Sequence, residues 1–471
     1  MTNTSCSSKS ISRAHVFLCA LFTCALALVL WPQSALADVR SDDVIVDQTV
    51  EQKSLPTSKC PDVDSEYAIL TDGDGKVYFS RGAYTKAQIA SITKLMTAIV
   101  AYEFNPDLDE TITVTDAAAK VGESSAGLKS GDTMNLQTAI KALMVHSGND
   151  AAVSIATSLG KKMLEADGSS DTSEDACVAR FVKAMNDKAA DLGLKDTVFT
   201  NPHGLDYDEF EGELHSNASD VAIEVAYAVK IDALMDITKL AKTTITVNRG
   251  NQKVGIDLDS TNTLLTTYDG TIGVKTGFTD KAGYCFAGAN QSDGKTMIAV
   301  CLNASSDGAR FVDCQNLWDW YKAHWVNYKL INAEQTVDAT IQDKSTSFPV
   351  VAKVAHKDWE DKTVKATVFD FEKAVELFDM EGNVSQDVQY NEVTGNVKIG
   401  DVLGKITFYQ RNKEIASFDL LAAEDVDAPG LLEGLGIWWS RFASGCTGAT
   451  VTTAESTLLN DTPLLLDKTS A

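Results

Sequence analysis

The chain carries two hydrophobic patterns, a helical one in its first half and an alternating one toward its end. Apolar residues spaced three and four positions apart predict helices at 92–100, 136–144, 181–192 and 221–229. Runs rich in β-branched and aromatic residues predict strands at 67–71, 76–80, 244–248, 271–278, 284–290 and 296–304. A tryptophan-rich helix is expected over 307–329. Strands, then helices, then strands closed by a helix predict an α+β domain with an antiparallel sheet over 66–330.

The pattern changes near residue 337. Alternating runs divided by turn residues predict a separate β-rich domain over 335–424. The stretch 429–443 then places its large apolar side chains on one helical stripe: Leu431, Leu432, Leu435, Trp438, Trp439 and Phe442. This amphipathic helix is predicted to lie on a membrane surface or to pack on the protein, and its paired tryptophans favour the membrane. Residues 444–471 are mostly polar and are predicted to be disordered.

The N-terminus has the features of an export signal. Lys9 and Arg13 precede the apolar run 16–30, and Ala35-Leu36-Ala37 supplies a small-residue cleavage site. Residues 1–37 are therefore predicted to be a signal peptide, with an uncleaved anchor as the alternative. The polar, aperiodic stretch 38–65 is predicted to be a flexible lead-in. The protein is expected to be exported, to the outer face of the cytoplasmic membrane or the cell-wall space.

Charge excludes one class of partner. Without the leader, 39 basic and 66 acidic residues remain, because the leader contains two basic residues and no acidic ones. Such an acidic chain repels phosphate backbones, so nucleic-acid binding is not expected.

Cysteine and histidine spacing indicates no metal or cofactor site. His203 is expected to bond to backbone within its turn. If the hairpin at 284–304 is symmetric about Asp293, Cys285 and Cys301 face each other. They would then form a cross-strand disulfide or remain two buried free thiols, and the free thiols are favoured.

Three short motifs carry the chemistry: Ser91-x-x-Lys94, Ser147-Gly148-Asn149 and Lys275-Thr276-Gly277. Serine is a weak nucleophile until a base removes its proton, and lysine can be that base only when neutral. Ser91 and Lys94 are three residues apart at the start of a predicted helix, so they share a face. Burial and a second cation, for which Lys275 is the candidate, would lower the Lys94 pKa. The ordered set is typical of an active-site serine acyl transferase.

The remaining motif residues suit substrate binding. The Ser147 hydroxyl can relay protons to a leaving amine, and the Asn149 amide can hold a substrate peptide group. Lys275 and Thr276 suit a carboxylate, and Gly277 leaves the strand bare for close substrate approach.

Each motif alone is weak evidence. Ser158–Lys161 and Ser292–Lys295 repeat the first spacing, and Ser260-Thr261-Asn262 repeats the middle motif. A helix-capping serine, a Ser-Gly-Asn turn and a lysine on a solvated sheet face are the ordinary explanations of the single motifs. Neither competing Ser-x-x-Lys opens a helix, Lys-Thr-Gly occurs once, and the complete set favours catalysis.

Residues from about Tyr67 to Tyr328 resemble the D-alanyl-D-alanine carboxypeptidases, the low-molecular-mass penicillin-binding proteins. The matching strings are Ala90-Ser-Ile-Thr-Lys-Leu-Met-Thr97, His146-Ser-Gly-Asn-Asp-Ala151, Asn201-Pro-His-Gly-Leu-Asp206, and residues 269–283. The resemblance implies an α+β penicillin-recognising domain of the serine transpeptidase and β-lactamase type, followed by a small β-rich domain without catalytic motifs.

The same resemblance implies residue roles. Ser91 would be the acylated nucleophile, Lys94 the base, Ser147 the proton relay and Asn149 the substrate holder. Lys275 and Thr276 would bind the substrate carboxylate, and the N–H groups of Ser91 and Phe278 would form the oxyanion hole. Some relatives carry histidine where this chain has Phe278. Arg310 either matches a family arginine near the carboxylate site or is a surface arginine at a helix start.

The expected activity is that of a serine D,D-carboxypeptidase. It would remove the terminal D-alanine from peptidoglycan pentapeptide stems through an acyl-enzyme on Ser91, and β-lactams would acylate the same serine. A class A-like β-lactamase and a non-catalytic wall-binding protein are the alternatives. The middle motif reads Ser-Gly-Asn, not Ser-Asp-Asn, and a β-rich domain follows, which argues against the β-lactamase.

Overall fold

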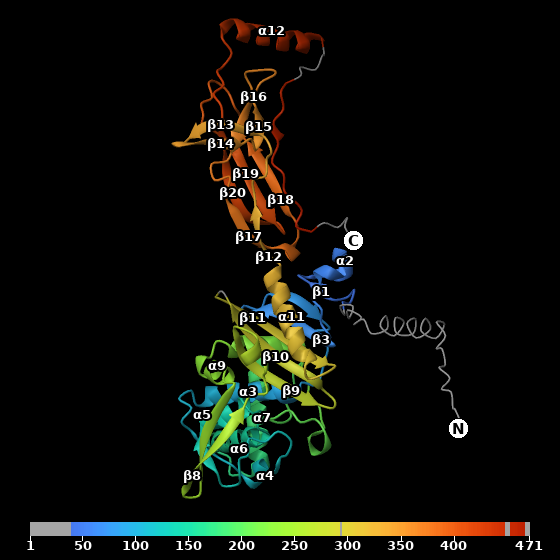
Figure 1. The fold of residues 1–471 in the computed structure, drawn as a ribbon, viewed down its shortest axis with the longest axis vertical. Coiled ribbons are helices and arrows are strands. Elements are labelled where there is room, and N and C mark those ends of the chain that lie inside the picture. Colours follow the sequence, from blue (N-terminus) through green and yellow to red (C-terminus); the bar gives the residue numbers. More distant parts are fainter. Residues whose placement is uncertain (1–38, 293, 448–452, 467–471) are drawn as a thin grey trace, which may run out of the picture.

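The computed structural model describes residues 39–447, apart from position 293, and residues 453–466. The predicted signal peptide therefore lies outside the described residues. The described chain is elongated (Figure 1). A domain of helices and strands forms one end, a narrower β-rich domain extends from it, and helix α12 (Leu431–Thr447) lies across the far end. The predicted order of an α+β domain followed by an all-β region is confirmed.

A seven-stranded antiparallel sheet is the centre of the first domain, in the order β2-β1-β4-β3-β11-β10-β9. Pairing of β3 with β11 brings the start and the end of the domain side by side. Strand β9, which carries Lys275-Thr276-Gly277, lies at the edge of the sheet. The strands are β1 (Val44–Ile45), β2 (Gln48–Thr49), β3 (Tyr67–Asp72), β4 (Val77–Arg81), β9 (Thr271–Thr279), β10 (Gly283–Ser292) and β11 (Lys295–Ala304).

Helix α3 (Lys94–Phe104) is the central helix, and the 3-10 turn η2 (Ala90–Thr93) leads into it. Residues 94–101 are buried without exception, so α3 is not the amphipathic helix that its spacing predicted. A helix enclosed by protein needs no polar face, and α5, α6, α7, α8 and α9 all contact α3. The other helices are α4 (Asp116–Lys120), α5 (Leu136–Met144), α6 (Asn149–Ala166), α7 (Glu174–Asp191), α8 (Ala218–Ala228), α9 (Asp232–Thr238), α10 (Leu264–Thr267) and α11 (Ala309–Ala323).

A smaller antiparallel sheet lies at the end of the molecule away from α12 (Figure 1). Its strand order is β5-β6-β7-β8, with β5 (Thr111–Thr113), β6 (Thr133–Asn135), β7 (Lys242–Arg249) and β8 (Gln252–Asp259). The β8 strand leads through Ser260-Thr261-Asn262 toward β9, so this sheet helps to place the active-site strand.

The predicted flexible lead-in at 38–65 is wrong, because the described part of this segment is packed on the first domain. Strands β1 and β2 extend the central sheet beside β4, and helix α2 (Val50–Lys53) follows with Thr49 as its cap. Ile45 and Val63 are fully buried. Buried Asp43 pairs with Arg81 at 2.7 Å between Oδ2 and Nη2. A few apolar anchors and one satisfied buried charge pair fix a segment that is polar on average.

The β-rich domain consists of a six-stranded antiparallel sheet, in the order β18-β19-β20-β16-β15-β21, and two two-stranded sheets, β13-β14 and β12-β17. Strand β12 follows α11 and pairs with β17, whose Phe378 is buried against Tyr78 and Tyr321 of the first domain. The two domains therefore share core packing at their junction. The strands are β12 (Trp325–Lys329), β13 (Thr336–Ile341), β14 (Lys344–Pro349), β15 (Ala352–Ala355), β16 (Thr363–Thr367), β17 (Ala374–Phe378), β18 (Val384–Tyr390), β19 (Val402–Gln410), β20 (Lys413–Ala422) and β21 (Thr457–Leu458).

The predicted disorder of 444–471 is wrong for the described residues 453–466. Strand β21 pairs with β15 and completes the six-stranded sheet. Buried Asn460 donates from Nδ2 to Leu330 O at 3.0 Å and accepts at Oδ1 from Asn332 N at 2.7 Å. Leu466 is buried in the core at the domain junction. A few specific hydrogen bonds hold a short polar segment of this kind. The segment has no repeating hydrophobic pattern, so its sequence does not predict that it is ordered.

The cysteines of the described residues are free thiols, and five of the six are buried. The hairpin register pairs Phe286 with Cys301 and Ser292 with Lys295, so Cys285 does not face Cys301. The predicted symmetry about Asp293 is therefore wrong by one residue. Cys301 instead contacts Cys314 of α11 at 3.5 Å between the sulfur atoms. The favoured alternative, buried free thiols that pack as small apolar side chains, is confirmed.

Candidate active site

The three motifs meet at one open cleft of about 450 Å³. Its walls come from η2, the α5–α6 connection, β9, α11 and the loops that follow α4, α7 and β8. Segments far apart in the chain therefore supply one site. The lining residues are Ser91, Glu123, Ser124, Ser147, Asn149, Leu205, Tyr207, Thr261, Thr276, Gly277, Phe278, Thr279, Asp280 and Arg310.

Ser91 and Lys94 are in direct contact. Lys94 Nζ lies 2.6 Å from Ser91 Oγ and donates to His203 O at 3.0 Å. Ser91 lies in the 3-10 turn and Lys94 begins α3, so the contact spans one turn. Lys94 is fully buried, and this burial, followed by the charge of Lys275, holds its pKa well below 10.5 although Asp150 acts in the opposite direction. A lowered pKa favours the neutral form of Lys94, the form that can accept a proton.

Lys275 connects the second and third motifs. Its Nζ donates to Ser147 Oγ at 2.9 Å and to Thr276 O at 2.9 Å. Burial, and then the charge of Arg310, lowers the Lys275 pKa to about 7. Ser147 is held at φ 63° in the connection between α5 and α6, a conformation that is uncommon for residues other than glycine. Lys275 is therefore placed to orient the Ser147 hydroxyl from behind the cleft wall.

Asn149 presents an unused acceptor. Its Nδ2 donates to Gly122 O at 3.1 Å, and its backbone N–H donates to Ser124 O at 2.7 Å. The Asn149 side chain is 1% exposed and lines the cleft, and its Oδ1 has no hydrogen-bond partner among the described residues. Buried polar atoms are rarely left unpaired. Oδ1 is thus available to accept an N–H from a bound peptide.

Gly277 has a different purpose from the one predicted. A Cβ atom at this position would lie 2.7 Å from Ile89 O and 3.1 Å from Ser91 N. The missing side chain therefore lets β9 pack against the backbone of η2 and does not leave room for substrate. The same close approach brings the backbone of β9 at Gly277 beside the Ser91 amide. The amides of Ser91 and Phe278 would serve there as an oxyanion hole.

Arg310 is not a surface residue. It is 6% exposed, and its Nη1 donates to Gly277 O at 2.8 Å and to Cys285 O at 3.1 Å. Asp307 forms an ion pair with its Nη2. The guanidinium therefore ties α11 to β9 and β10 and adds positive charge at one end of the cleft. Phe278 is 48% exposed and packs on Tyr284 at the cleft rim.

Several lining residues were not predicted from the sequence. Thr261 Oγ1 lies 2.6 Å from Thr276 Oγ1, so the competing Ser-x-Asn string at 260–262 belongs to the site through its central threonine. Glu123 comes from a loop without a motif, and Tyr207 directly follows the matching string at 201–206. Within the acidic loop 206–213, Asp206 is buried and Tyr207 lines the cleft. Sequence contains no signal for these contacts, because loop packing creates them.

His203 has a structural environment. It is buried, Leu205 N donates to its Nδ1 at 3.2 Å, and Asn201 Oδ1 accepts from its backbone N–H. Burial, and then Lys94, lowers the His203 pKa to about 3, so the ring is neutral. The expectation that His203 bonds to backbone in its turn is confirmed. Among the described residues, no three histidine, cysteine or acidic side chains gather in a way that could hold a metal ion.

Comparison with known proteins identifies the family. The family model of the D-alanyl-D-alanine carboxypeptidases matches residues 54–306, which include all three motifs. The chain belongs to this family. The D-alanyl-D-alanine carboxypeptidase DacF of Bacillus subtilis is 27% identical over 379 residues, covering 78% of this chain and 87% of the relative. The D-alanyl-D-alanine carboxypeptidase of Streptomyces sp. K15 is 30% identical over 258 residues, covering 53% of this chain and 84% of the relative.

Solved structures of similar proteins cover the same region. The crystal structure of the Streptomyces K15 DD-transpeptidase matches with a TM-score of 0.51 and 27% identity, over 56% of this carboxypeptidase-family chain and 98% of the other. The D-alanyl-D-alanine carboxypeptidase DacD of Francisella tularensis matches with a TM-score of 0.50 over 78% of this chain and 94% of the other, at 22% identity. This second match extends the likeness of fold beyond the first domain.

Proposed function

We propose that this protein is a serine D,D-carboxypeptidase that removes the terminal D-alanine from peptidoglycan pentapeptide stems. Neutral Lys94 accepts the Ser91 proton as Oγ attacks the carbonyl carbon between the two D-alanines. The amides of Ser91 and Phe278 stabilise the oxyanion. The C–N bond then breaks, the proton taken up by Lys94 passes through Ser147 to the leaving amine, and D-alanine departs with Lys94 neutral again. Water attacks the ester with Lys94 again as base, which releases the shortened peptide and restores Ser91.

The observation that carries this proposal is the Ser91–Lys94 contact. A 2.6 Å separation to a fully buried lysine with a lowered pKa supplies the general base that a serine nucleophile requires. The carboxylate of the leaving D-alanine is attracted to the end of the cleft that holds Thr276, Thr261 and Arg310. β-Lactams, whose amide resembles the D-alanyl-D-alanine peptide bond, would acylate the same serine.

Fluorescent penicillin tests the nucleophile. The wild-type protein should take the label, Ser91→Ala should not, and Ser158→Ala should remain labelled because Ser158 belongs to the competing Ser-x-x-Lys string on α6. Mass spectrometry of muropeptides incubated with the wild-type protein should then show loss of one alanine from pentapeptides. Rapid turnover of the label without D-alanine release would instead indicate a β-lactamase, and absence of labelling would indicate a non-catalytic binder.

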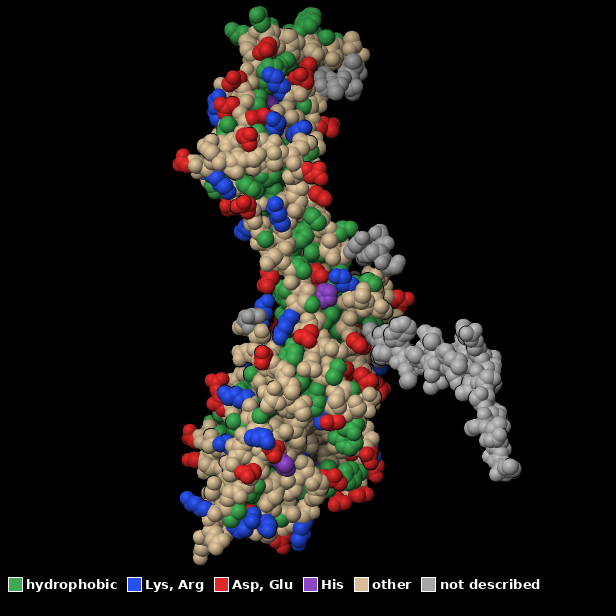
Figure 2. Space-filling view, viewed as in Figure 1, with side chains coloured by type: hydrophobic (Ala, Val, Ile, Leu, Met, Phe, Trp, Pro, Cys, Tyr) green, Lys and Arg blue, Asp and Glu red, His purple; other side chains and the backbone are tan. Residues whose placement is uncertain are grey.

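The proposal includes export and attachment to a membrane surface. Six large apolar side chains of α12 are 51% to 91% exposed, and apolar side chains gather at this far end of the molecule (Figure 2). None of the helices in the described ranges is long and apolar enough to cross a bilayer. An amphipathic helix that lies in the interface would cover this apolar surface. The first domain, which contains the cleft, lies at the opposite end of the molecule from α12 (Figure 1) and would then extend away from the membrane.

Vesicle binding tests the attachment. Arg441 is the basic residue of α12, and it already donates to Lys357 O at 2.8 Å. Binding should therefore depend on apolar burial and should be similar for phosphatidylcholine vesicles with and without anionic lipid. The double change Trp438→Ser and Trp439→Ser should abolish sedimentation with vesicles. Val402→Ser, which removes an exposed apolar side chain elsewhere on the β-rich domain, should not. Equal binding of all three proteins would contradict the attachment.

A further inference from the structure

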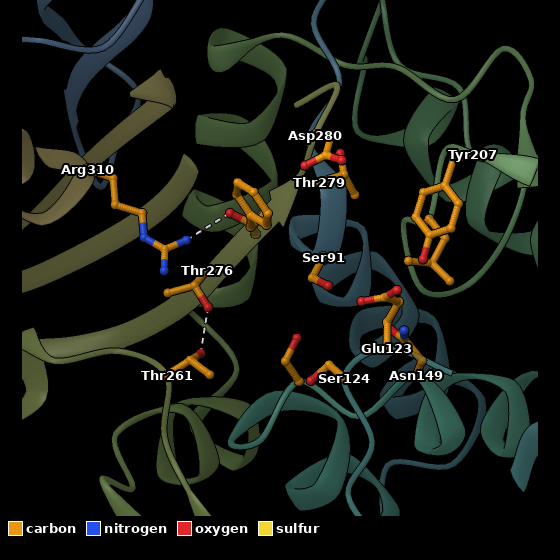
Figure 3. A pocket seen from close by; sticks show the side chains of 14 residues that line it. Ser91, Glu123, Ser124, Asn149, Tyr207, Thr261, Thr276, Thr279, Asp280 and Arg310 are labelled. Carbon is orange, nitrogen blue, oxygen red and sulfur yellow. Dashed lines mark hydrogen bonds between the residues drawn. The ribbon is translucent and has the colours of Figure 1, made fainter. Parts of the chain in front are cut away.

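The cleft has two chemically different ends. Figure 3 shows Ser91 between Arg310, Thr276 and Thr261 on one side and Glu123 and Tyr207 on the other. In the proposed reaction the leaving D-alanine carries the carboxylate, so it occupies the end with Arg310. The rest of the peptide is on the other side of the scissile bond. The acyl chain must therefore leave Ser91 toward Glu123.

Glu123 is an exposed carboxylate at that end, and no lysine or arginine of the described chain forms an ion pair with it. Tyr207 lines the same end of the cleft (Figure 3). Burial, and then the neighbouring Glu123, raises the Tyr207 pKa to about 12, so the Tyr207 hydroxyl stays protonated. The acyl end of the cleft thus presents an exposed carboxyl group that pairs with no lysine or arginine of the described residues.

The backbone at Glu123 is fixed to the catalytic motif. Gly122 O accepts from the Asn149 side chain at 3.1 Å, and Ser124 O accepts from the Asn149 backbone at 2.7 Å. Ser124 Oγ also donates to His146 O at 3.1 Å. Glu123 is held between these contacts at φ 57°, where residues other than glycine are uncommon. The backbone of Glu123 is therefore fixed relative to Asn149, and its exposed side chain extends from a set position at this end of the cleft.

Asn149 independently indicates a ligand at this end. Its Oδ1 is buried, lines the cleft and has no partner among the described residues. A peptide N–H of the acyl chain would satisfy it. An extended peptide advances about 3.3 Å per residue. A substrate peptide that binds Asn149 therefore places the residue before its two D-alanines close to Glu123.

We propose that Glu123 makes this enzyme select stem peptides in which the residue before the two terminal D-alanines has a free amino group on its side chain. The inference rests on the proposed function and narrows its substrate class to diamino-acid stems that are not yet cross-linked. Forming a cross-link converts that ammonium to a neutral amide and removes its attraction to Glu123.

Two matched peptides test the selection: Nα-acetyl-L-Lys-D-Ala-D-Ala and the same peptide with its Nε acetylated. The wild-type kcat/KM for D-alanine release should favour the free amine by about threefold to fivefold at low salt, the range of an exposed ion pair. The preference should shrink at high ionic strength, because salt screens such pairs. Glu123→Gln should remove the preference, and Glu123→Lys should reverse it.

Glu209→Gln is the matched control, because Glu209 lies on the neighbouring loop that carries Tyr207 but does not line the cleft. It should keep the wild-type preference, and thermal unfolding should show that all variants are folded. Equal kcat/KM for the two peptides in the wild type, or a preference that survives Glu123→Gln, would overturn the inference. In that case D-alanine release and penicillin labelling of wild-type Ser91 would still support the proposed function. If the wild-type protein neither releases D-alanine nor takes the penicillin label, the proposed function and this inference are both rejected.

Discussion

Replacing Gly277 with alanine tests whether β9 and the nucleophile turn must touch. The added Cβ would lie 2.7 Å from Ile89 O and 3.1 Å from Ser91 N. Both neighbours are backbone atoms, so neither can rotate away. Carbon–oxygen contacts in proteins lie at about 3.3 Å or more. The two segments would therefore have to separate by about 0.6 Å, the difference between that contact and the available space.

A shift of this size has two consequences. Overpacking a well-filled core costs about 1 to 3 kcal/mol of unfolding free energy. Displacement of a catalytic group by about 1 Å can lower a rate by 10²-fold, so acylation of Ser91 by penicillin should slow by about tenfold to 10²-fold. Acylation should slow by more than the unfolded fraction of the variant accounts for, because Ser91 is displaced even in the folded variant.

Stopped-flow labelling with fluorescent penicillin measures the acylation rate, and calorimetry measures the stability. Gly255→Ala on β8 is the matched control, since its Cβ would meet Thr244 Cγ2 at an ordinary 3.6 Å. It should leave both quantities near the wild-type values. If Gly277→Ala is acylated as fast as the wild type, the close packing of β9 on η2 does not position the nucleophile, and the reasoning fails.

Three further predictions concern ionisation and packing. Because burial and Lys275 lower the Lys94 pKa, the acylation rate should rise with pH and level off well below pH 10.5; a rise that continues to pH 10 would contradict the assigned base. Burial, followed by the charge of Asp220, raises the pKa of Glu224 in the folded protein. The protein is therefore most stable when Glu224 is neutral. This contribution to stability is complete below pH 4.5 and is lost as pH rises through the folded-state pKa. Glu224→Gln should therefore be about 2 kcal/mol more stable than the wild type at pH 8 and similar at pH 4, and parallel stability curves would refute this. Asn460→Ala should destabilise the β-rich domain by about 2 kcal/mol in urea unfolding, because it leaves buried backbone groups unpaired, and an unchanged midpoint would show that residues 453–466 are dispensable.

Periodic features of the chain were predictable. Helical spacing located α5, α7 and α8, and alternating runs predicted that the region 335–424 is rich in strands, because both patterns reflect one buried face. Aperiodic segments were not predictable. Residues 39–65 and 453–466 are held by single contacts such as Arg81 with Asp43, and such contacts leave no repeating signature. The hairpin register differed by one residue, and with it the partner of Cys301, because turn geometry fixes register locally.

For the site, the sequence by itself determined the chemical groups and one local contact. Ser91 and Lys94 lie three residues apart, and the geometry of one helical turn brings them together wherever that turn is placed. Tertiary structure decided everything that depends on remote neighbours. Burial and the charge of Lys275 lower the Lys94 pKa, η2 requires glycine at Gly277, and loop packing brings Glu123 to the cleft. Desolvation and charge coupling act through space, so no spacing along the chain can encode them alone.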